Sequence, residues 1–228
     1  MHILVTNDDG IDAPGLAALV EVARSLGEVT VVAPDCHRSG CSHAATSDQS
    51  LRIVERGPRH FALCGTPVDC VRVALLHLEP RIELVLSGIN DGGNLGVDVL
   101  MSGTVAAARE AALLGRRAVA VSQYRRRGRR PNWPRSSRLA AAALSHLPRH
   151  SDDKVAVWNV NLPGIDGEEL PDIVLAPLDR HPLPIHYEVV DGVLNYVCNY
   201  HERPRDRGSD VDECFAGRIA ISRLPTQI

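Results

Sequence analysis

Hydrophobic and polar positions follow two alternating patterns along the first two thirds of the chain. Five short apolar runs have the character of buried strands: residues 2–6, 28–33, 82–87, 118–122 and 155–161. Four segments between them place apolar side chains at helical spacing: residues 14–26, 66–78, 102–114 and 138–147. Strands that alternate with helices are typical of a parallel sheet covered by helices, so the pattern predicts an α/β fold.

Turn and capping signals subdivide this pattern. Residues 51–55 and 60–64 are predicted to pair as a hairpin around a Gly-Pro turn, and Thr66 fits the N-cap of the helix that follows. Residues 34–50 show no periodicity and are rich in Ser, His, Gly and Asp. A loop of this length in a compact domain is usually functional or disordered.

The character of the chain changes in its last hundred or so residues. Residues 124–136, with five arginines between Arg125 and Arg130, are predicted to be an exposed loop. Four later segments are strand-like: residues 173–175, 186–190, 193–199 and 218–223. We therefore predict an α/β core over residues 1–163 and a β-rich C-terminal region over residues 164–228, joined in one structural unit.

Composition narrows the class of protein. The chain has 228 residues, of which 44% are apolar and 23% charged, with a net charge of -3. These values are those of a globular protein and exclude a disordered or fibrous one. The near-neutral total argues against a protein dedicated to binding nucleic acid, because phosphate contacts need a surplus of Lys and Arg.

The sequence also indicates the cellular compartment of the protein. No apolar run approaches the roughly 18 residues that a membrane span needs, and residues 1–6 begin directly as a strand. Six cysteines, none in a Cys-x-x-Cys pair, are too few for a disulfide scaffold and are expected to be reduced thiols. We expect a cytoplasmic protein without membrane contact.

Polar side chains gather where predicted strands end. Asp8 and Asp9 follow the first strand, and Asn90 and Asn94 follow the strand at residues 82–87. In open α/β sheets ligands bind beyond the carboxyl ends of the strands. Two carboxylates in one loop can converge on a cation, although Asp-Asp-Gly alone is more often a turn.

The loop after the second predicted strand offers a further oxygen ligand, the hydroxyl of Ser39. A zinc site is the alternative there, built from the nearby thiols and imidazoles: Cys36, His37, Cys41 and His43. Their spacing matches no common zinc module. Together with the carboxylates and an amide, Ser39 gives an all-oxygen set that suits Mg²⁺ or Mn²⁺ better than zinc.

Ser102-Gly103-Thr104 opens the helix that follows the third of these loops. Glycine permits close approach of an anion, hydroxyls donate hydrogen bonds, and a helix start favours negative charge. Taken alone, the tripeptide is more often an N-cap without a ligand. Next to cation ligands on three strand ends, it indicates a site for metal-assisted phosphoryl transfer.

These residues resemble the SurE family of 5′/3′-nucleotidases, known as stationary-phase survival proteins. The resemblance covers nearly the whole chain. It is strongest in residues 3–10 (ILVTNDDG), 32–35 with 38–40, 65–71 (GTPVDCV), 87–96 and 102–108 (SGTVAAA), and it continues in 159–163 and 210–222. It implies a Rossmann-like core, with a C-terminal hairpin that subunits of a homodimer or homotetramer exchange.

The resemblance also implies a site and an activity. It implies one divalent ion held by Asp8, Asp9, Ser39 and Asn90, with Asn94, Ser102, Gly103 and Thr104 around the phosphate and His43 close by. The implied reaction is hydrolysis of nucleoside 5′- or 3′-monophosphates, and of short polyphosphate in some members. Asp8 and Asp9 are the expected catalytic residues.

Three features depart from the family pattern. Asp91 stands where a neutral or basic residue is usual and adds negative charge beside the expected cation. The arginines from Arg125 to Arg130 have no family counterpart. The sequence Ser222-Arg223-Leu224-Pro225 replaces the usual Ser-Ile-Thr-Pro, which bears on contacts of a tetramer.

Two other functions are compatible with the sequence. A nucleotide-binding oxidoreductase or transferase would use the same fold, but the first turn is Asn-Asp-Asp-Gly, not Gly-x-Gly-x-x-Gly, and its aspartates would repel a pyrophosphate. An RNA-binding protein would use Arg125–Arg130 as its arm. A solvated charged loop is the plainer interpretation, because the run lacks interleaved aromatic residues.

Overall fold

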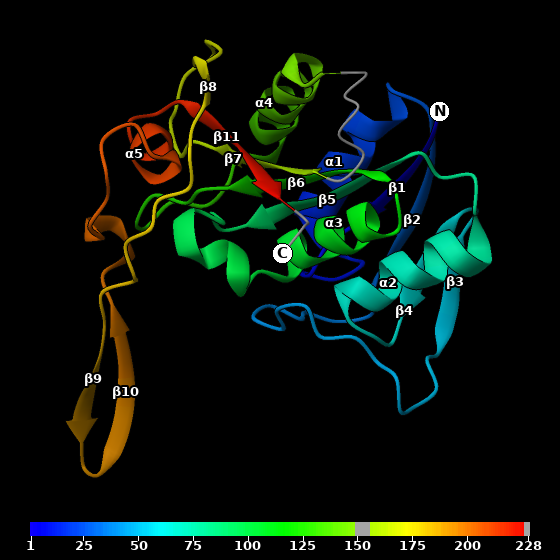
Figure 1. Ribbon diagram of the computed structural model, residues 1–228, viewed down its shortest axis with the longest axis horizontal. Coiled ribbons are helices and arrows are strands. Elements are labelled where there is room, and N and C mark those ends of the chain that lie inside the picture. The colour runs from blue at the N-terminus through cyan, green and yellow to red at the C-terminus, as the bar shows by residue number, and fades with distance from the viewer. Residues whose placement is uncertain (149–155, 226–228) are drawn as a thin grey trace.

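One mixed sheet of nine strands forms the centre of the molecule in the computed structural model, which describes residues 1–148 and 156–225 (Figure 1). Its strand order is β3-β4-β2-β1-β5-β6-β7-β11-β8. The six strands from β4 to β7 run parallel: β4 (His60–Leu63), β2 (Glu28–Pro34), β1 (His2–Thr6), β5 (Leu84–Asp91), β6 (Arg117–Gln123) and β7 (Ala156–Leu162). The mostly parallel α/β sheet confirms the predicted fold class.

The remaining strands lie at the two edges or outside the sheet. Strand β3 (Ile53–Gly57) pairs antiparallel with β4, as the predicted hairpin requires. At the other edge, β11 (Ile219–Pro225) pairs antiparallel with β7, and β8 (Ile173–Leu175) runs parallel to β11. Two of the four C-terminal strands therefore complete the central sheet.

The other two C-terminal strands form a separate hairpin. Strands β9 (Ile185–Val190) and β10 (Val193–Cys198) pair antiparallel with each other as a separate two-stranded sheet and extend away from the body of the molecule (Figure 1). Two short helical segments follow them, η3 (Tyr200–Glu202) and α5 (Asp210–Phe215).

Helices cover both faces of the sheet. Helices α1 (Pro14–Arg24) and α4 (Trp133–His146) pack on one face, where Ile3 and Val5 of β1 point. Helices α2 (Pro67–Val73), its π-helical continuation η1 (Ala74–Leu78) and α3 (Gly103–Leu113) pack on the opposite face, where Leu4 points. Strands buried on both faces explain the continuous apolar runs. In the part of the chain described, every helix is too short or too polar to cross a membrane.

Several predicted boundaries were wrong. Strand β5 does not end at residue 87 but continues to Asp91, after a shift in its pairing with β6 between Ser87 and Asn90. Helix α4 begins at Trp133, not at residue 138, because the side chain of Asn132 accepts a hydrogen bond from the Arg135 N–H at 3.1 Å and caps the helix. Helix α5 was not predicted. The predicted strand start at residue 155 lies outside the described residues.

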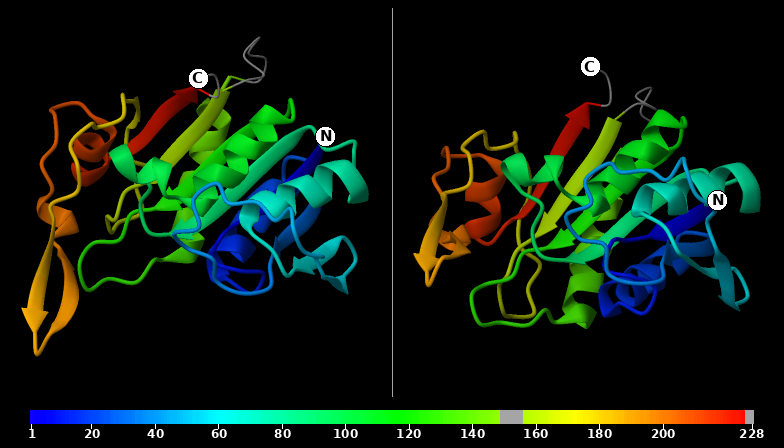
Figure 2. Two further views of the ribbon diagram at one scale, coloured as in Figure 1. Left: turned by 60° about the horizontal axis from the view of Figure 1, so that its bottom comes forward. Right: turned by 90° about the horizontal axis from the view of Figure 1, so that it is seen from below.

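The strand order reverses at the carboxyl end of β1. The chain leaves β1 for β2 on one side and later returns to β5 on the other, so β1 and β5 flank the point where the strand order reverses. The chain segments that follow neighbouring parallel strands meet at this end of the sheet (Figure 2). Asp8 follows β1, and Asn90 lies near the end of β5.

Gly15 allows α1 to pack closely on β5 and α4. A Cβ at this position would lie 2.0 Å from the carbonyl oxygen of Ile89 and 2.9 Å from the ring of Trp133. Gly15→Ala should therefore lower the free energy of unfolding by about 2 kcal/mol or more, measured by urea denaturation. Gly57→Ala is the matched control, because its Cβ would meet no atom within 4 Å. Equal stability of the two variants would contradict this packing.

Candidate metal and phosphate site

Asp8 is the centre of the contacts at the carboxyl end of β1. Its side chain is almost completely buried, with 3% of the residue exposed. The Thr104 hydroxyl at the start of α3 donates a hydrogen bond to Asp8 Oδ1. The Arg38 N–H, from the loop after β2, donates to the carbonyl oxygen of Asp8 at 2.7 Å. Two of the predicted loops and the predicted helix start therefore meet at one residue.

Asp9 connects the first loop to the end of β5. Its Oδ2 accepts a hydrogen bond from the Asp91 N–H at 3.0 Å, and its Oδ1 lies 3.4 Å from Nδ1 of His37. The carboxylate of Asp91 lies 3.3 Å from Nε of Arg125. Two departures from the family pattern, Asp91 and the arginine-rich loop, are therefore in contact, and the guanidinium offsets the added negative charge.

The electrostatics of the two aspartates follow from their burial. Burial raises the pKa of Asp8 above its ordinary value, the neighbouring Asp9 raises it further, and the hydrogen bond from Thr104 opposes these effects. Burial also raises the pKa of Asp9, and the hydrogen bond from the Asp91 N–H opposes it. Two adjacent, desolvated carboxylates are unfavourable when both are ionised, and a bound cation would relieve that cost.

The start of α3 lies directly against Asp8. A Cβ at Gly103 would lie 2.9 Å from Cβ and 3.0 Å from Oδ2 of Asp8, so only glycine fits without movement. The oxygen of Ser102 accepts a hydrogen bond from the Val105 N–H at 3.1 Å and caps the helix. Its hydroxyl hydrogen remains available as a donor to a ligand.

Asn94 is held by side chains that the sequence did not single out. Asn161 of β7 accepts from the Asn94 N–H at 2.9 Å and donates to the Asn94 carbonyl oxygen at 3.0 Å. Asn159 donates to the same carbonyl at 2.8 Å, and Nδ2 of Asn94 donates to Ser122 at 2.7 Å. Asparagine is depleted in strands, so two asparagines inside a strand segment were a usable signal.

The segment from Asn94 to Ser102 is held by residues that follow the hairpin. The N–H of Gly96 donates to Asp210 Oδ2 at 2.8 Å. Asp98 Oδ2 accepts from the Tyr200 hydroxyl at 2.8 Å and from Nη1 of Arg203 at 2.7 Å. The position of the predicted phosphate-binding segment therefore depends on the C-terminal part of the chain.

His43, in the long loop after β2, forms a hydrogen bond with a residue of α3. Its Nε2 lies 2.8 Å from Oε2 of Glu110, a buried residue that also accepts from Nε of Arg72 at 2.6 Å. The hydrogen bonds to Glu110 lower its pKa against the opposing effect of burial.

The other two predicted metal ligands lie in the loop after β2 and at the end of β5. Ser39 is exposed and follows Arg38, whose N–H contacts Asp8. Nδ2 of Asn90 donates a hydrogen bond to the Gly92 carbonyl oxygen at 2.8 Å. The predicted ligand atom, Oδ1, takes no part in this bond.

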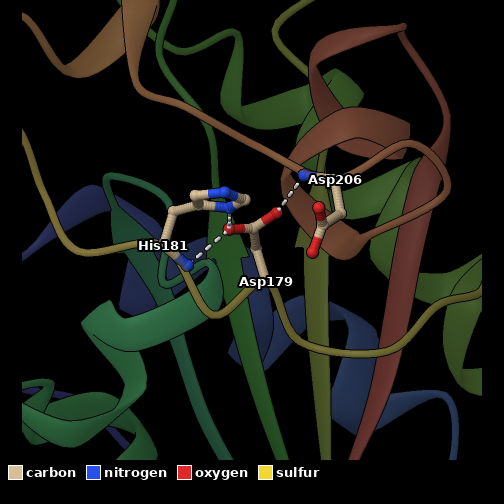
Figure 3. A group of neighbouring side chains, drawn as sticks. All are labelled: Asp179, His181 and Asp206. Carbon is tan, nitrogen blue, oxygen red and sulfur yellow. Dashed lines mark hydrogen bonds and ion pairs between the residues drawn. The ribbon is translucent and has the colours of Figure 1, made fainter.

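The structure brings one cluster of acidic and histidine side chains together at another place. Within the described residues, the sole group of three that could share a metal ion is Asp179, His181 and Asp206 (Figure 3). Both carboxylate oxygens of Asp179 are already engaged, Oδ1 with the His181 N–H at 2.9 Å and Oδ2 with the Asp206 N–H at 2.7 Å. The cysteine and histidine side chains considered for zinc do not form such a group in the described part of the chain.

The fold and these contacts define a class: a Rossmann-like α/β protein with a buried carboxylate, an adjacent second one and a helix start at its switch point. The chain matches the family model "Survival protein SurE" over residues 3–182. It therefore belongs to the SurE family.

Relatives and a solved structure agree with this membership. The 5′-nucleotidase SurE of Geobacter sulfurreducens is 44% identical over 98% of this chain and 87% of its own. A protein of Synechocystis sp. is 43% identical over 98% of this chain and 99% of its own. The crystal structure of the SurE protein from Aquifex aeolicus superimposes with a TM-score of 0.89 at 28% identity, covering 100% of this chain and 94% of that one.

The burial of Asp8 has a measurable consequence for stability. A carboxyl whose pKa is raised in the folded state contributes stability at low pH that is lost as pH rises through the raised pKa. In protein kept in chelator, Asp8→Asn should therefore raise Tm by a few degrees at pH 8 and by much less at pH 4, measured by thermal unfolding. Asp48→Asn, at an exposed position, is the control. Equal shifts of Tm at both pH values would contradict the buried, ionised Asp8.

Proposed function

We propose that this protein is a metal-dependent phosphomonoesterase that hydrolyses nucleoside 5′- or 3′-monophosphates to nucleoside and phosphate. The observation that carries the proposal is the contact of Asp8 with Thr104 and Gly103 at the switch point. In this contact a carboxylate suited to a cation lies directly beside a helix start suited to phosphate, which supports the proposal. The name 5′-nucleotidase SurE of the relative from Geobacter sulfurreducens supports the same reaction class.

The residues fit a hard divalent cation. Asp8, Asp9, Ser39 and Asn90 offer oxygen atoms, which Mg²⁺ and Mn²⁺ prefer. The burial that raises the pKa of both aspartates is the cost that such an ion would offset. We assign one ion of this kind to each subunit.

The remaining groups would bind and orient the phosphate. Gly103 allows the ester to approach the backbone at the start of α3. The donors that we assign to it are the Ser102 hydroxyl, the backbone N–H of Thr104 and the second amide hydrogen of Asn94, because the Thr104 hydroxyl already donates to Asp8. The ion, when bound, would polarise the phosphoryl group and lower the pKa of a coordinated water. His43, held by Glu110, borders the site from the long loop.

Two routes for the aspartates remain distinct. In one, Asp8 or Asp9 orients and deprotonates the water that attacks phosphorus in line. In the other, Asp8 is itself the nucleophile and forms an aspartyl-phosphate that water then hydrolyses. Trapping an acyl-phosphate on Asp8 would establish the covalent route.

The test of function is phosphate release from a panel of nucleoside 5′- and 3′-monophosphates with Mg²⁺, with Mn²⁺ and with chelator. Activity should require metal, and Asp8→Asn should lower it by about a hundredfold or more, because a ligand next to the reacting group is lost. Asp48→Asn should keep full activity. Metal-independent turnover, or an unaffected Asp8→Asn protein, would contradict the proposal.

We also propose a homodimer or homotetramer in which the hairpin β9–β10 packs on a second copy. Its large apolar side chains lie in solvent: Ile185, Tyr187, Val189, Val190, Val193, Leu194 and Tyr196. An isolated two-stranded hairpin is marginally stable in water, and an exposed apolar patch of this kind indicates a protein partner.

Charge placed on the hairpin should disrupt this assembly. Val189→Asp with Leu194→Asp should shift the protein toward monomer in sedimentation velocity, because both side chains are more than 60% exposed in the single chain. Leu170→Asp, exposed outside the hairpin, is the control. A wild-type protein that sediments as a monomer would contradict the proposed assembly.

A further inference from the structure

A hollow of about 500 Å³ opens beside the candidate site. One wall is Gly92-Gly93, which directly follows Asp91 at the end of β5, and another is Tyr200 with His201. The third wall is the loop that leaves the end of β6, residues 124–129. The hollow therefore joins the edge of the sheet where Asp8 and Asp9 lie to the arginine-rich loop.

A chain of direct contacts connects this hollow to the aspartates. Asp9 accepts a hydrogen bond from the Asp91 N–H at 3.0 Å, and the Asp91 carboxylate lies 3.3 Å from Nε of Arg125. Arg125 lines the hollow. A group bound to Arg125 in the hollow would thus be connected to Asp9 through Asp91.

The lining of the hollow is strongly basic. Four arginines contribute to it: Arg125, Arg126, Arg127 and Arg129. Arg125 is paired with Asp91, and Arg129 lies 3.6 Å from Asp166. Over residues 1–148 and 156–225, Arg126 and Arg127 form no ion pair with a carboxylate. Both arginines also line an adjoining hollow of about 570 Å³, together with Arg205. Two guanidinium groups are therefore available to an anion.

We propose that this hollow is a second phosphate subsite, and that the enzyme acts on nucleoside bisphosphates, whose leaving group carries a phosphate of its own. The proposal rests on the proposed phosphatase function. A planar guanidinium binds phosphate with two parallel hydrogen bonds, which makes Arg126 and Arg127 suited to this group. A volume of about 500 Å³ accommodates a nucleoside-sized ligand.

The reaction at the site is ordinary hydrolysis. The bond between the scissile phosphorus and the ester oxygen breaks, the oxygen of water joins phosphorus, and a proton passes to the ester oxygen. The products are inorganic phosphate and a nucleoside monophosphate, whose remaining phosphate stays in the hollow until release. Arg126 and Arg127 are specificity-determining residues that contact the retained phosphate and not the reacting one.

The test compares kcat/KM for adenosine 3′,5′-bisphosphate and for adenosine 5′- and 3′-monophosphates, with the full-length protein and saturating Mg²⁺ or Mn²⁺. The wild type should favour the bisphosphate. Arg126→Ser with Arg127→Ser should lower kcat/KM for the bisphosphate about fivefold or more, because two partly exposed charge pairs are lost, and should change the monophosphates by less than about twofold. Added salt should weaken the bisphosphate reaction more.

Arg130→Ser is the matched control, because Arg130 belongs to the same loop but does not line this hollow. It should leave the preference unchanged. An equal loss for bisphosphate and monophosphates, or a wild type without preference, would overturn the subsite while the phosphatase function stands. Absence of hydrolysis of any nucleotide would overturn the function itself. Binding of a short RNA without terminal phosphates, lost in the double variant while the preference stays, would assign the loop to RNA and overturn the proposal.

Discussion

The buried carboxylate of Asp8 is the constraint around which the rest of the site is arranged. A desolvated negative charge needs partners, and here they come from the Thr104 hydroxyl and from the backbone turn that follows β1. Because Gly103 has no side chain, α3 can begin in contact with this carboxylate. The same contact that stabilises Asp8 brings it next to the helix start at which we propose that the phosphate binds.

Much of the precision of the site comes from side chains that need not touch a substrate. Asn161 binds both backbone groups of Asn94, so strand β7 sets the position of a loop that follows β5. Glu110 of α3 binds His43 and so ties the long loop after β2 to the helix that approaches Asp8. Both residues are buried, and their polar groups rigidify the loops because each hydrogen bond is made in a desolvated setting.

The sequence predicted the parts of the fold that depend on local pattern. The parallel strands, the start of α2 at Thr66 and the meeting of Asp8 with Thr104 follow from periodicity, capping signals and the rule on strand ends. It did not predict that β5 continues to Asp91, because that extension depends on a shifted pairing with β6. Nor did it predict the hydrogen bonds between Asn161 and the backbone of Asn94, since the two residues are far apart in the chain. Helix α5 was missed because its six residues are too few to show a helical periodicity, although its cap, Ser209, and its acidic first turn are signals of a helix start.

The hydrogen bonds that hold the segment from Asn94 to Ser102 have a consequence for folding during translation. Asp210, Arg203 and Tyr200 hold that segment, and all three are translated after the hairpin. During synthesis, the sheet from β1 to β6 can form while the segment beside Asp8 still lacks these hydrogen bonds. A chain released early by the ribosome would therefore carry both aspartates and the helix start in a folded core without a finished site. Translation of residues 200–210 would act as the step that separates a folded core from a complete site.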